Sequence, residues 1–442
     1  MHWHIHPPIS RRTALAAGLA AFVPIDDTFR IAPFQCDATP DKGEPNIWVQ
    51  PVTTVMDPLL VKGVVIESAS RRYVLAALDW CGVGGAIDLQ LRTALARGAG
   101  TDIKRIALQS VHQHAAPYVE GDAYRILAKV RPNDLRMSDA YLNRLATALE
   151  DAVRKALSSA QPFDQVGTGE ARVERVASAR RILKNGQVVT RFSTSGKSPE
   201  LAAEPEGPID PILRSITFAA AGKPLVRLHY YATHPQTFCC DGRVSADFVG
   251  SARAAMEAHD GIPQLYFTGC GGDVTVGKYN KGEDAERAVL SEHLLAAMKA
   301  SAAATKFHTV EHFEWRYRDL VLPPRTAPGS FPDDPQLAYR AAITAAFAAR
   351  TRPLPTSALH LGPAVITHLP GEPLLEFQRY AQSLSGGRLI AVAGYGDISP
   401  GYLCPDEVLR QGGYEPSASN AAAGTEARVK SILKELLAPS TN

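Results

Sequence analysis

Two histidines separated by a single residue, His112 and His114, are the first candidates for chemistry in the 442-residue sequence. They follow directly after an apolar run, residues 105–111, which predicts a β-strand. Side chains two residues apart on an extended chain point to the same side, so both imidazoles would face one space. One imidazole could then bind a metal while the other transfers a proton. Histidines are also common in surface loops, so this pair alone does not decide between a site and a loop.

A third histidine, His234, follows another apolar run, residues 225–231, and Asp247 comes shortly after it. His234 therefore occupies the same kind of position, at the end of a predicted strand. His229 lies inside the run, and we expect it to be a core histidine whose hydrogen bonds are satisfied.

A glycine-rich turn after the run 264–268 contains Asp273 and Thr275. Its glycines leave backbone amides free, and the hydroxyl of Thr275 stands close to a carboxylate. Taken by itself, this segment is a tight turn.

Glu372 and two tyrosines, Tyr402 and Tyr414, complete the candidate residues in the last part of the chain. Glu372 follows the apolar run 364–369 and stands before Pro373. Proline is favoured at the first position of a helix, so Glu372 could either cap a helix or bind a metal.

These residues must be positioned by the carboxyl ends of neighbouring strands, where mixed sheets form their ligand sites. Apolar runs predict strands at residues 60–66, 73–78, 105–111, 215–219, 225–231, 264–268, 313–322, 364–369 and 389–394. Amphipathic stretches predict helices at residues 86–96, 140–157, 248–258, 285–300, 335–349, 373–384 and 426–437. This alternation predicts an α/β (mixed α+β) fold, with central mixed β-sheets flanked by helices in a single catalytic domain. Residues 119–138 and 193–208 are polar and rich in turn residues, which favours long loops over a site.

The composition excludes several classes of protein. Hydrophobic residues make up 45% of the chain and charged residues 21%, which is typical of a folded core rather than of disorder. The formal net charge is only +2, so no nucleic-acid partner is expected.

Residues 1–24 are expected to be an export signal of the twin-arginine type, because Arg11 and Arg12 precede a run of small and apolar residues. The remaining domain, residues 25–442, would be exported to the periplasm or the extracellular space and be soluble after signal removal. No clear cleavage site follows the apolar run, so a retained anchor is the alternative.

The six cysteines are scattered along a chain that is long enough to fold without disulfides. Buried free thiols are therefore the favoured interpretation. The adjacent pair Cys239 and Cys240 could instead form a vicinal disulfide, which is the less favoured alternative.

Taken together and in this order, the motifs resemble the catalytic domain of the neutral, non-lysosomal ceramidases, zinc amidases that cleave the N-acyl bond of sphingolipids. The match covers nearly the whole chain after the export segment. His112-Gln-His114 is similar to that family's Thr-His-Thr-His-Ser-Gly-Pro motif. The resemblance implies a Zn²⁺ ion bound by His112, His234, Glu372 and Tyr402.

The resemblance also implies roles for residues around the metal. His114 would carry a proton, and Tyr414 would be a second active-site tyrosine that binds substrate. Thr275 stands where the family has a serine in Gly-Asp-Val-Ser. Arg180, or its neighbour Arg181, would match the arginine that contacts the substrate carbonyl.

The expected chemistry follows from the metal. Zinc lowers the pKa of a bound water from about 15.7 to roughly 7, and the resulting hydroxide would attack an acyl carbonyl. His114 would then protonate the departing amine. Asp247 and Asp273 are expected to orient the zinc-binding histidines.

The departures from the family concern the substrate more than the metal. Ala115-Ala116-Pro117 replaces Ser-Gly-Pro, Thr275 replaces a serine, and the chain ends where ceramidases continue into an immunoglobulin-like domain. We therefore expect a secreted zinc-dependent hydrolase of an N-acyl (amide) bond in a small-molecule or lipid substrate, with at most transient contact with a membrane surface.

Two alternatives stay open: a hydrolase of a non-lipid amide or ester, and a non-catalytic exported metal-binding protein. An open pocket at the metal would favour catalysis, and a closed site would favour a structural role.

Overall fold

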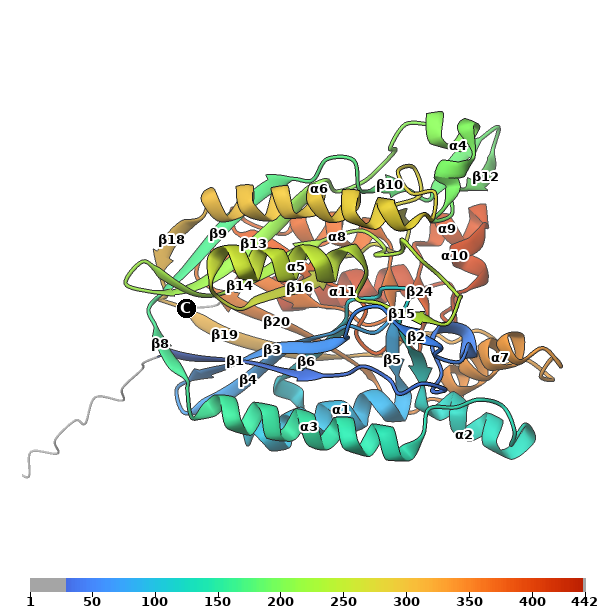
Figure 1. Ribbon diagram of the computed structural model, residues 1–442, viewed down its shortest axis with the longest axis horizontal. Coiled ribbons are helices and arrows are strands. Elements are labelled where there is room, and N and C mark those ends of the chain that lie inside the picture. Colours follow the sequence, from blue (N-terminus) through green and yellow to red (C-terminus); the bar gives the residue numbers. More distant parts are fainter. Residues whose placement is uncertain (1–28, 440–442) are drawn as a thin grey trace, which may run out of the picture.

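The computed structural model describes residues 29–439, so the predicted export segment lies outside the described residues. Three larger β-sheets form the centre of the molecule, and helices cover them on several sides (Figure 1). The expected mixed α+β class, with mixed sheets flanked by helices, is confirmed.

Each of the three sheets is antiparallel except for one pair of strands at its edge, which is parallel. The first sheet has the order β6-β4-β3-β1-β8, with β1 (Phe29–Asp37), β3 (Leu60–Ser68), β4 (Arg71–Leu78), β6 (Ile106–Ser110) and β8 (Gln161–Phe163). The second has the order β16-β14-β13-β9-β18, with β9 (Gln165–Arg172), β13 (Ile212–Ala220), β14 (Lys223–Tyr231), β16 (Gln264–Thr268) and β18 (Lys306–Thr309). The third has the order β19-β20-β21-β23, with β19 (Phe313–Leu320), β20 (Leu354–Leu361), β21 (Ala364–His368) and β23 (Leu389–Ala393). The parallel edge pairs are β4–β6, β14–β16 and β21–β23.

Five short strand pairs join the loops between these sheets. They are β2 (Thr54–Val55) with β15 (Arg243–Val244), β5 (Gly82–Gly84) with β7 (Tyr118–Glu120), β10 (Ser178–Ala179) with β17 (Val274–Thr275), β11 (Arg181–Lys184) with β12 (Gln187–Thr190), and β22 (Glu372–Pro373) with β24 (Tyr402–Leu403).

The helices pack in pairs against the sheets. Helices α1 (Gly85–Ala99) and α3 (Asp139–Leu157) contact the first sheet, α5 (Asp247–Asp260) and α6 (Asp284–Ala303) the second, and α8 (Leu375–Ser383) and α11 (Thr425–Leu437) the third. Figure 1 shows α1 and α3 below the sheets and α6 above them. The other helices are α2 (Gly121–Val130), α4 (Pro199–Ala203), α7 (Pro335–Ala348), α9 (Asp406–Gln411) and α10 (Tyr414–Ser417), with short 3-10 turns at Ile47–Val49, Ile103–Arg105 and Ser195–Lys197.

The long helix α3 shows how the sequence specifies these elements. The Ser138 side chain accepts a hydrogen bond from the N–H of Tyr141 and so caps the first turn. Leu142, Leu145 and Leu149 recur at helical spacing and are buried, which places one apolar stripe against the first sheet. The spacing and the cap together account for the helix.

One buried apolar cluster includes side chains from all three sheets, among them Val64, Leu228 and Ile366. The sheets therefore share a core, as expected for a single domain. Within residues 29–439, no helix combines the length and apolar character needed to span a bilayer.

The prediction of a long loop over 119–138 is wrong for its middle part, where α2 forms. Ala123, Tyr124 and Leu127 bury one face of α2, and Glu120 caps it by accepting from the N–H of Ala123. The polar residues of this segment concealed that short apolar stripe. The second expected loop, 193–208, likewise contains the short helix α4.

Several strands are absent from the predicted set, and β9 and β20 are the longest strands in the second and third sheets that it lacks. β9 contains Gly167 and Gly169, residues that are rare in strands. β20 begins Leu354-Pro355 and carries Thr356 and Ser357, which interrupt its apolar pattern.

Candidate metal centre

The three residues proposed from strand ends come from three different sheets. His112 follows β6, His234 follows β14, and Glu372 follows β21, so each lies beyond the carboxyl end of a strand in a parallel edge pair. The three edges meet at one point, which brings residues far apart in the chain into one group. This arrangement is the one that open sheets use to form ligand sites.

The ligand atoms of these residues converge closely. The Nε2 atom of His112 lies 3.2 Å from Oε2 of Glu372, and the Nε2 atom of His234 lies 3.4 Å from the same oxygen. The hydroxyl of Tyr402 lies 3.5 Å from Nε2 of His234. All four side chains are buried. The structure thus brings together the four residues that the sequence proposed as metal ligands.

Backbone carbonyls fix the protonation pattern of the two histidines. Nδ1 of His112 lies 2.5 Å from the carbonyl oxygen of Cys81, and Nδ1 of His234 lies 2.7 Å from that of Gly271. A carbonyl can only accept, so each Nδ1 carries a hydrogen, and each Nε2 is the atom that a neutral imidazole offers to a metal. Burial lowers the pKa of His234 to about 3, which keeps its imidazole neutral.

Oε2 of Glu372 is buried and has no hydrogen-bond partner among the described residues. It faces the Nε2 atoms of His112 and His234, so when both imidazoles are neutral three electron-rich atoms lie together with no hydrogen between them. A buried group of this kind is costly unless a cation lies among the atoms. Two imidazole nitrogens, a carboxylate and a phenol oxygen suit a divalent ion such as zinc. The residues present therefore fit a metal.

A second group, Cys81, His112 and His114, also brings potential ligand atoms within 4.8 Å of one another. It shares His112, whose Nδ1 on the Cys81 side is already bonded to a carbonyl. Burial raises the pKa of the Cys81 thiol well above its usual value, which disfavours the thiolate that metals bind. The group with Glu372 is the better metal site.

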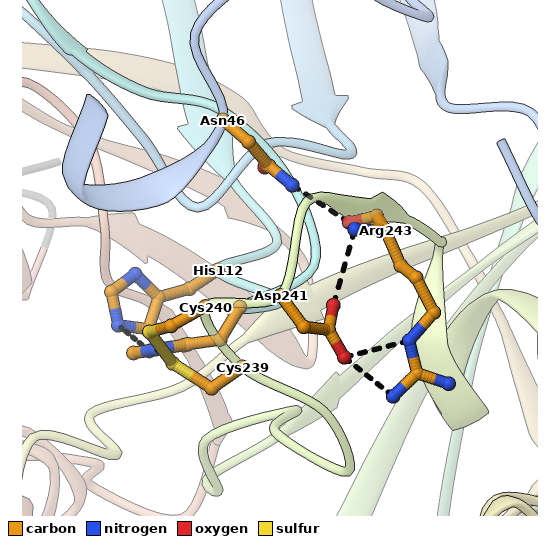
Figure 2. Close-up of a disulfide and its surroundings, with 7 residues drawn as sticks. Asn46, His112, Cys239, Cys240, Asp241 and Arg243 are labelled. Atoms are coloured by element: carbon orange, nitrogen blue, oxygen red, sulfur yellow. Dashed lines mark hydrogen bonds and ion pairs between the residues drawn. A yellow bond between two sulfur atoms is a disulfide. The ribbon is translucent and has the colours of Figure 1, made fainter. Parts of the chain in front are cut away.

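The second histidine of the pair, His114, stands beside the first. Its Nε2 lies 3.3 Å from Nε2 of His112, and the two rings meet edge to face. A vicinal disulfide joins Cys239 and Cys240 (Figure 2). Sγ of Cys239 lies 4.0 Å from Nδ1 of His114. The expectation of free thiols is therefore wrong for this pair, which lies where the chain turns back between β14 and α5. The other four cysteines are free, as expected.

Of the two adjacent arginines, it is Arg180 that faces the site. Its Nη1 donates to the hydroxyl of Tyr402 at 2.8 Å, and its guanidinium lies 5.6 Å from the ring centres of both Tyr402 and Tyr414. Arg181 points instead to Glu415, at 2.7 Å. Burial raises the pKa of the Tyr402 phenol well above its usual value, and the positive charge of Arg180 opposes that rise.

Three of the predicted site residues do not join this group. The hydroxyl of Thr275 accepts from the N–H of Gly277 and is not among the pocket-lining atoms. Asp247 accepts from the N–H and hydroxyl of Thr237. Asp273 accepts from the N–H of Leu375, at 2.8 Å.

The expectation that Asp247 and Asp273 orient the histidines is therefore wrong. Backbone carbonyls take that role, because the loops after the strands pass close enough to each Nδ1. Asp273 instead stabilises the start of α8, where a carboxylate is favourable at a helix N-terminus. This assignment also removes the capping interpretation of Glu372, since α8 begins at Leu375.

A tyrosine that sequence reasoning missed supports the first histidine. The ring of Tyr395 stacks on that of His112 with their centres 4.2 Å apart. Both residues have left-handed backbone conformations, with φ of 61° for Tyr395 and 73° for His112. Such conformations cost free energy outside glycine and cluster at functional sites. The sequence signal for Tyr395 was its place directly after the apolar run 389–394.

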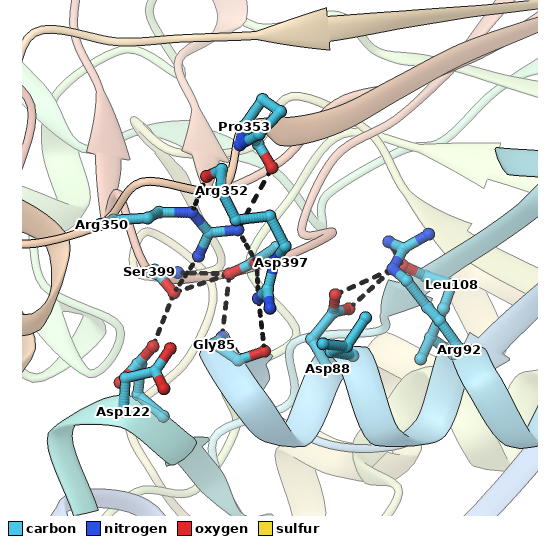
Figure 3. Close-up of polar contacts among 12 residues, drawn as sticks. Gly85, Asp88, Arg92, Leu108, Asp122, Arg350, Arg352, Pro353, Asp397 and Ser399 are labelled. Atoms are coloured by element: carbon cyan, nitrogen blue, oxygen red, sulfur yellow. Dashed lines mark hydrogen bonds and ion pairs between the residues drawn. The ribbon is translucent and has the colours of Figure 1, made fainter. Parts of the chain in front are cut away.

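A buried charge cluster holds the loop that carries these tyrosines. Asp397 accepts from the N–H of Gly85 at 3.2 Å, from the hydroxyl of Ser399 at 2.7 Å and from Arg350 at 2.7 Å (Figure 3). Its backbone carbonyl accepts from the N–H of Gly371. The loop between β23 and β24 is thus tied to the start of α1 and to the segment that ends at Glu372.

A pocket opens on the metal group. It is a small cavity, with about 70 Å³ of space that water-sized molecules can enter. Its lining combines the site residues with aromatic, aliphatic and polar side chains: Trp48, Cys81, His112, His114, Tyr118, Arg340, Ile343, Thr344, Glu372, Tyr402, Tyr414, Ser417, Ala418 and Asn420. Tyr414 therefore lies in the pocket wall, and the site is open to a ligand.

No protein-family model and no curated protein matches the sequence. Among the solved structures that share its fold are two of ceramidases. The structure of neutral ceramidase from Pseudomonas aeruginosa has a TM-score of 0.71 and 16% identity, and the match covers 93% of this chain and 74% of that one. A ceramidase complexed with C2 has a TM-score of 0.72 and 16% identity, with 93% and 75% covered. The expected likeness to the ceramidase catalytic domain is thus confirmed for the fold.

Proposed function

We propose that this chain hydrolyses N-acyl amide bonds with a divalent cation, zinc, held by His112, His234, Glu372 and Tyr402. The observation that carries the proposal is the unpartnered carboxylate oxygen of Glu372, which faces two imidazole lone pairs at the base of an open pocket. Structural zinc sites are closed, whereas catalytic ones leave a position free for water or substrate. The open pocket therefore favours catalysis over a purely structural metal.

When bound, zinc supplies a water of lowered pKa and polarises the acyl carbonyl. His114 lines the pocket, with its Nε2 atom 3.3 Å from that of His112. Burial lowers the pKa of His114 well below the usual value, so its imidazole is neutral and can accept a proton. The oxygen of water bonds to the carbonyl carbon, the carbon–nitrogen bond breaks, and the proton held by His114 passes to the amine nitrogen. A carboxylic acid and an amine are the products.

We assign Arg180 and Tyr414 to stabilising the negative charge that develops during this reaction. Arg180 is buried, positively charged and bonded to the hydroxyl of Tyr402. Tyr414 presents its ring to the pocket next to Arg180. Donors placed at the developing oxyanion in a site that excludes water are worth about 3 kcal/mol each.

The setting of the reaction is part of the proposal. The twin-arginine segment supports export to the periplasm or the extracellular space, and the Cys239–Cys240 disulfide suits an oxidising compartment. The exposed ring of Phe192 contacts that of Tyr414 at 5.6 Å. An apolar ring next to the pocket supports transient contact with a membrane surface or with the acyl part of a substrate.

Metal analysis together with an activity assay tests this function. The purified chain should carry about one zinc ion and cleave at least one of a panel of N-acyl amides. His112→Ala and Glu372→Gln should each lose most of the metal and all measurable turnover, because a site with one ligand removed binds its ion far more weakly. Full activity of His112→Ala on any amide would refute the zinc mechanism.

His259→Ala is a matched control, because His259 is an exposed histidine on α5, away from the pocket. It should retain both zinc and turnover. A chain that binds zinc tightly but cleaves no amide or ester would instead indicate the non-catalytic metal-binding alternative.

A further inference from the structure

The wall of the pocket contains one arginine without a partner. Arg340 projects from α7 into the space that also contains His112, His114 and Glu372. Within residues 29–439, no hydrogen bond or ion pair engages its guanidinium. The guanidinium lies over the ring of Trp48, 4.9 Å from the ring centre. The side chain is half-buried.

The other arginine close to the site is different. Arg180 donates to Tyr402 and lies 3.9 Å from the buried carboxylate of Glu415. Its charge is partly balanced by Glu415 and one of its N–H groups is bonded to Tyr402, which leaves the remaining donors for the acyl carbonyl. Arg340 has all of its N–H donors available, and the flat ring of Trp48 holds it in place without neutralising it.

The pocket offers Arg340 no carboxylate of its own to pair with. Among the described residues that line the pocket, Glu372 is the only acid, and it faces the metal group. Thr344 and Asn420, which line the same wall, are neutral and are hydrogen-bonded to each other at 2.7 Å. A divalent ion at His112 and His234 would make the pocket more positive still.

We propose that the amide substrate carries a carboxylate, as in an N-acyl amino acid, and that Arg340 binds this carboxylate. The inference rests on the proposed function and names its substrate class. A guanidinium presents paired N–H donors in a plane that matches a carboxylate, and such charge-assisted pairs are stronger than neutral hydrogen bonds. A neutral amine part, such as the uncharged sphingoid part of a ceramide, would leave Arg340 unpaired.

A pair of amides that differ only in charge tests the inference. N-octanoylglycine carries the carboxylate, and N-octanoylglycinamide replaces it with a neutral group of similar size. The metal-loaded wild-type chain should cleave N-octanoylglycine with a kcat/KM about tenfold or more above that for N-octanoylglycinamide. Arg340→Gln should remove this preference, and Arg340→Lys should retain part of it because the charge remains.

Binding provides a readout that does not depend on turnover. Calorimetric titration of the metal-free chain, which cannot turn the compound over, with N-octanoylglycine should show a Kd that rises about tenfold or more in Arg340→Gln. Arg125→Gln changes an exposed arginine on the neighbouring helix α2, outside this pocket, and should leave the ratio of the two kcat/KM values unchanged. The preference should also weaken as salt concentration rises, since part of the attraction is electrostatic.

Equal cleavage of the two amides by the wild type, or an equal loss on both in Arg340→Gln, would overturn the role of Arg340. Failure to cleave either compound would count against the proposed hydrolase activity. In that event the binding comparison alone decides the inference: a weaker Kd in Arg340→Gln upholds the carboxylate site, and an unchanged Kd rejects it.

Discussion

Glu372 and Tyr402 are register partners in the parallel pair β22–β24, so the backbone itself places the carboxylate and the phenol side by side. The N–H of Glu372 donates to the carbonyl of Gly401 at 2.9 Å, which fixes this register. Gly371 stands directly before the pair with φ of 65°, and a Cβ atom added there would lie 2.6 Å from the same carbonyl oxygen. The glycine thus permits the close approach of the two loops.

Gly371→Ala should therefore damage the metal site without touching a ligand. The new methyl group forces the two loops apart, and the left-handed backbone becomes strained, which together cost about 2 kcal/mol or more. We expect a lower zinc content at equilibrium with a fixed zinc buffer, and a lower midpoint of unfolding in urea.

Gly186→Ala is the matched control for that variant. Gly186 also has a positive φ, 77°, but a Cβ atom there would meet nothing within 4 Å. It should cost only the backbone strain, about 1 kcal/mol, and leave the zinc content unchanged. Equal zinc loss in both variants would show that the contact between Gly371 and Gly401 is unimportant.

The neighbouring arginines should separate clearly in kinetics. Arg180→Lys keeps the charge but shortens the reach to Tyr402, and we expect kcat to fall about 100-fold with zinc retained. Arg181→Lys changes a residue that pairs with Glu415 away from the pocket, and kcat should fall less than about threefold. Similar losses in the two variants would contradict the assignment of Arg180.

Glu120 should make stability depend on pH. Its carboxyl is buried, and burial raises its pKa from 4.5 to about 7. The hydroxyl oxygen of Ser399 lies 2.8 Å from Glu120 and 2.7 Å from Asp397. The hydroxyl has one hydrogen and can donate to only one of the two carboxylates. A protonated Glu120 would supply the second hydrogen by donating to Ser399. The folded state therefore binds more protons than the unfolded state between these two pKa values, and stability falls as pH rises through that window.

Glu120→Gln keeps a donor toward Ser399 and removes the charge. The variant should gain stability relative to the wild type as pH rises, reaching about 3 kcal/mol near pH 8, with little difference below pH 5. Urea unfolding at a series of pH values measures this. A difference that stays constant from pH 5 to pH 8 would rule out titration of Glu120.

The disulfide beside His114 gives a direct chemical prediction. The unfolded, unreduced protein should titrate with four free thiols, and the reduced protein with six. Because Cys239 contacts His114, reduction should lower kcat without releasing zinc. A chain with both Cys239→Ser and Cys240→Ser should show no such response to reductant, and an equal response would locate the effect elsewhere.

The positions of three candidate ligands could be predicted from the sequence because they share one local signal, whereas the ligand set as a whole was implied by the resemblance to the ceramidases. His112, His234 and Glu372 each follow an apolar run, and the structure places all three runs in parallel edge pairs. Apolar runs report burial on both faces of a strand, which is the signal that survives without knowledge of the fold.

The supporting contacts could not be read from the sequence, because they depend on how loops pass one another. Asp247 and Asp273 looked like partners for the histidines, but backbone carbonyls lie closer to each Nδ1. Carbonyls are present at every residue and leave no trace in composition. Arg340 likewise lies on an ordinary amphipathic helix, and only the packing of α7 turns it toward the pocket.

Because His112, His234 and Glu372 follow strands of three separate sheets, the proposed cation site forms only where the three sheets pack together. The proposed cation would link the three sheets, because its binding site is complete only in the folded chain. The chain should therefore fold before it binds the ion. Removal of the ion should weaken the packing between the sheets before any single sheet unfolds.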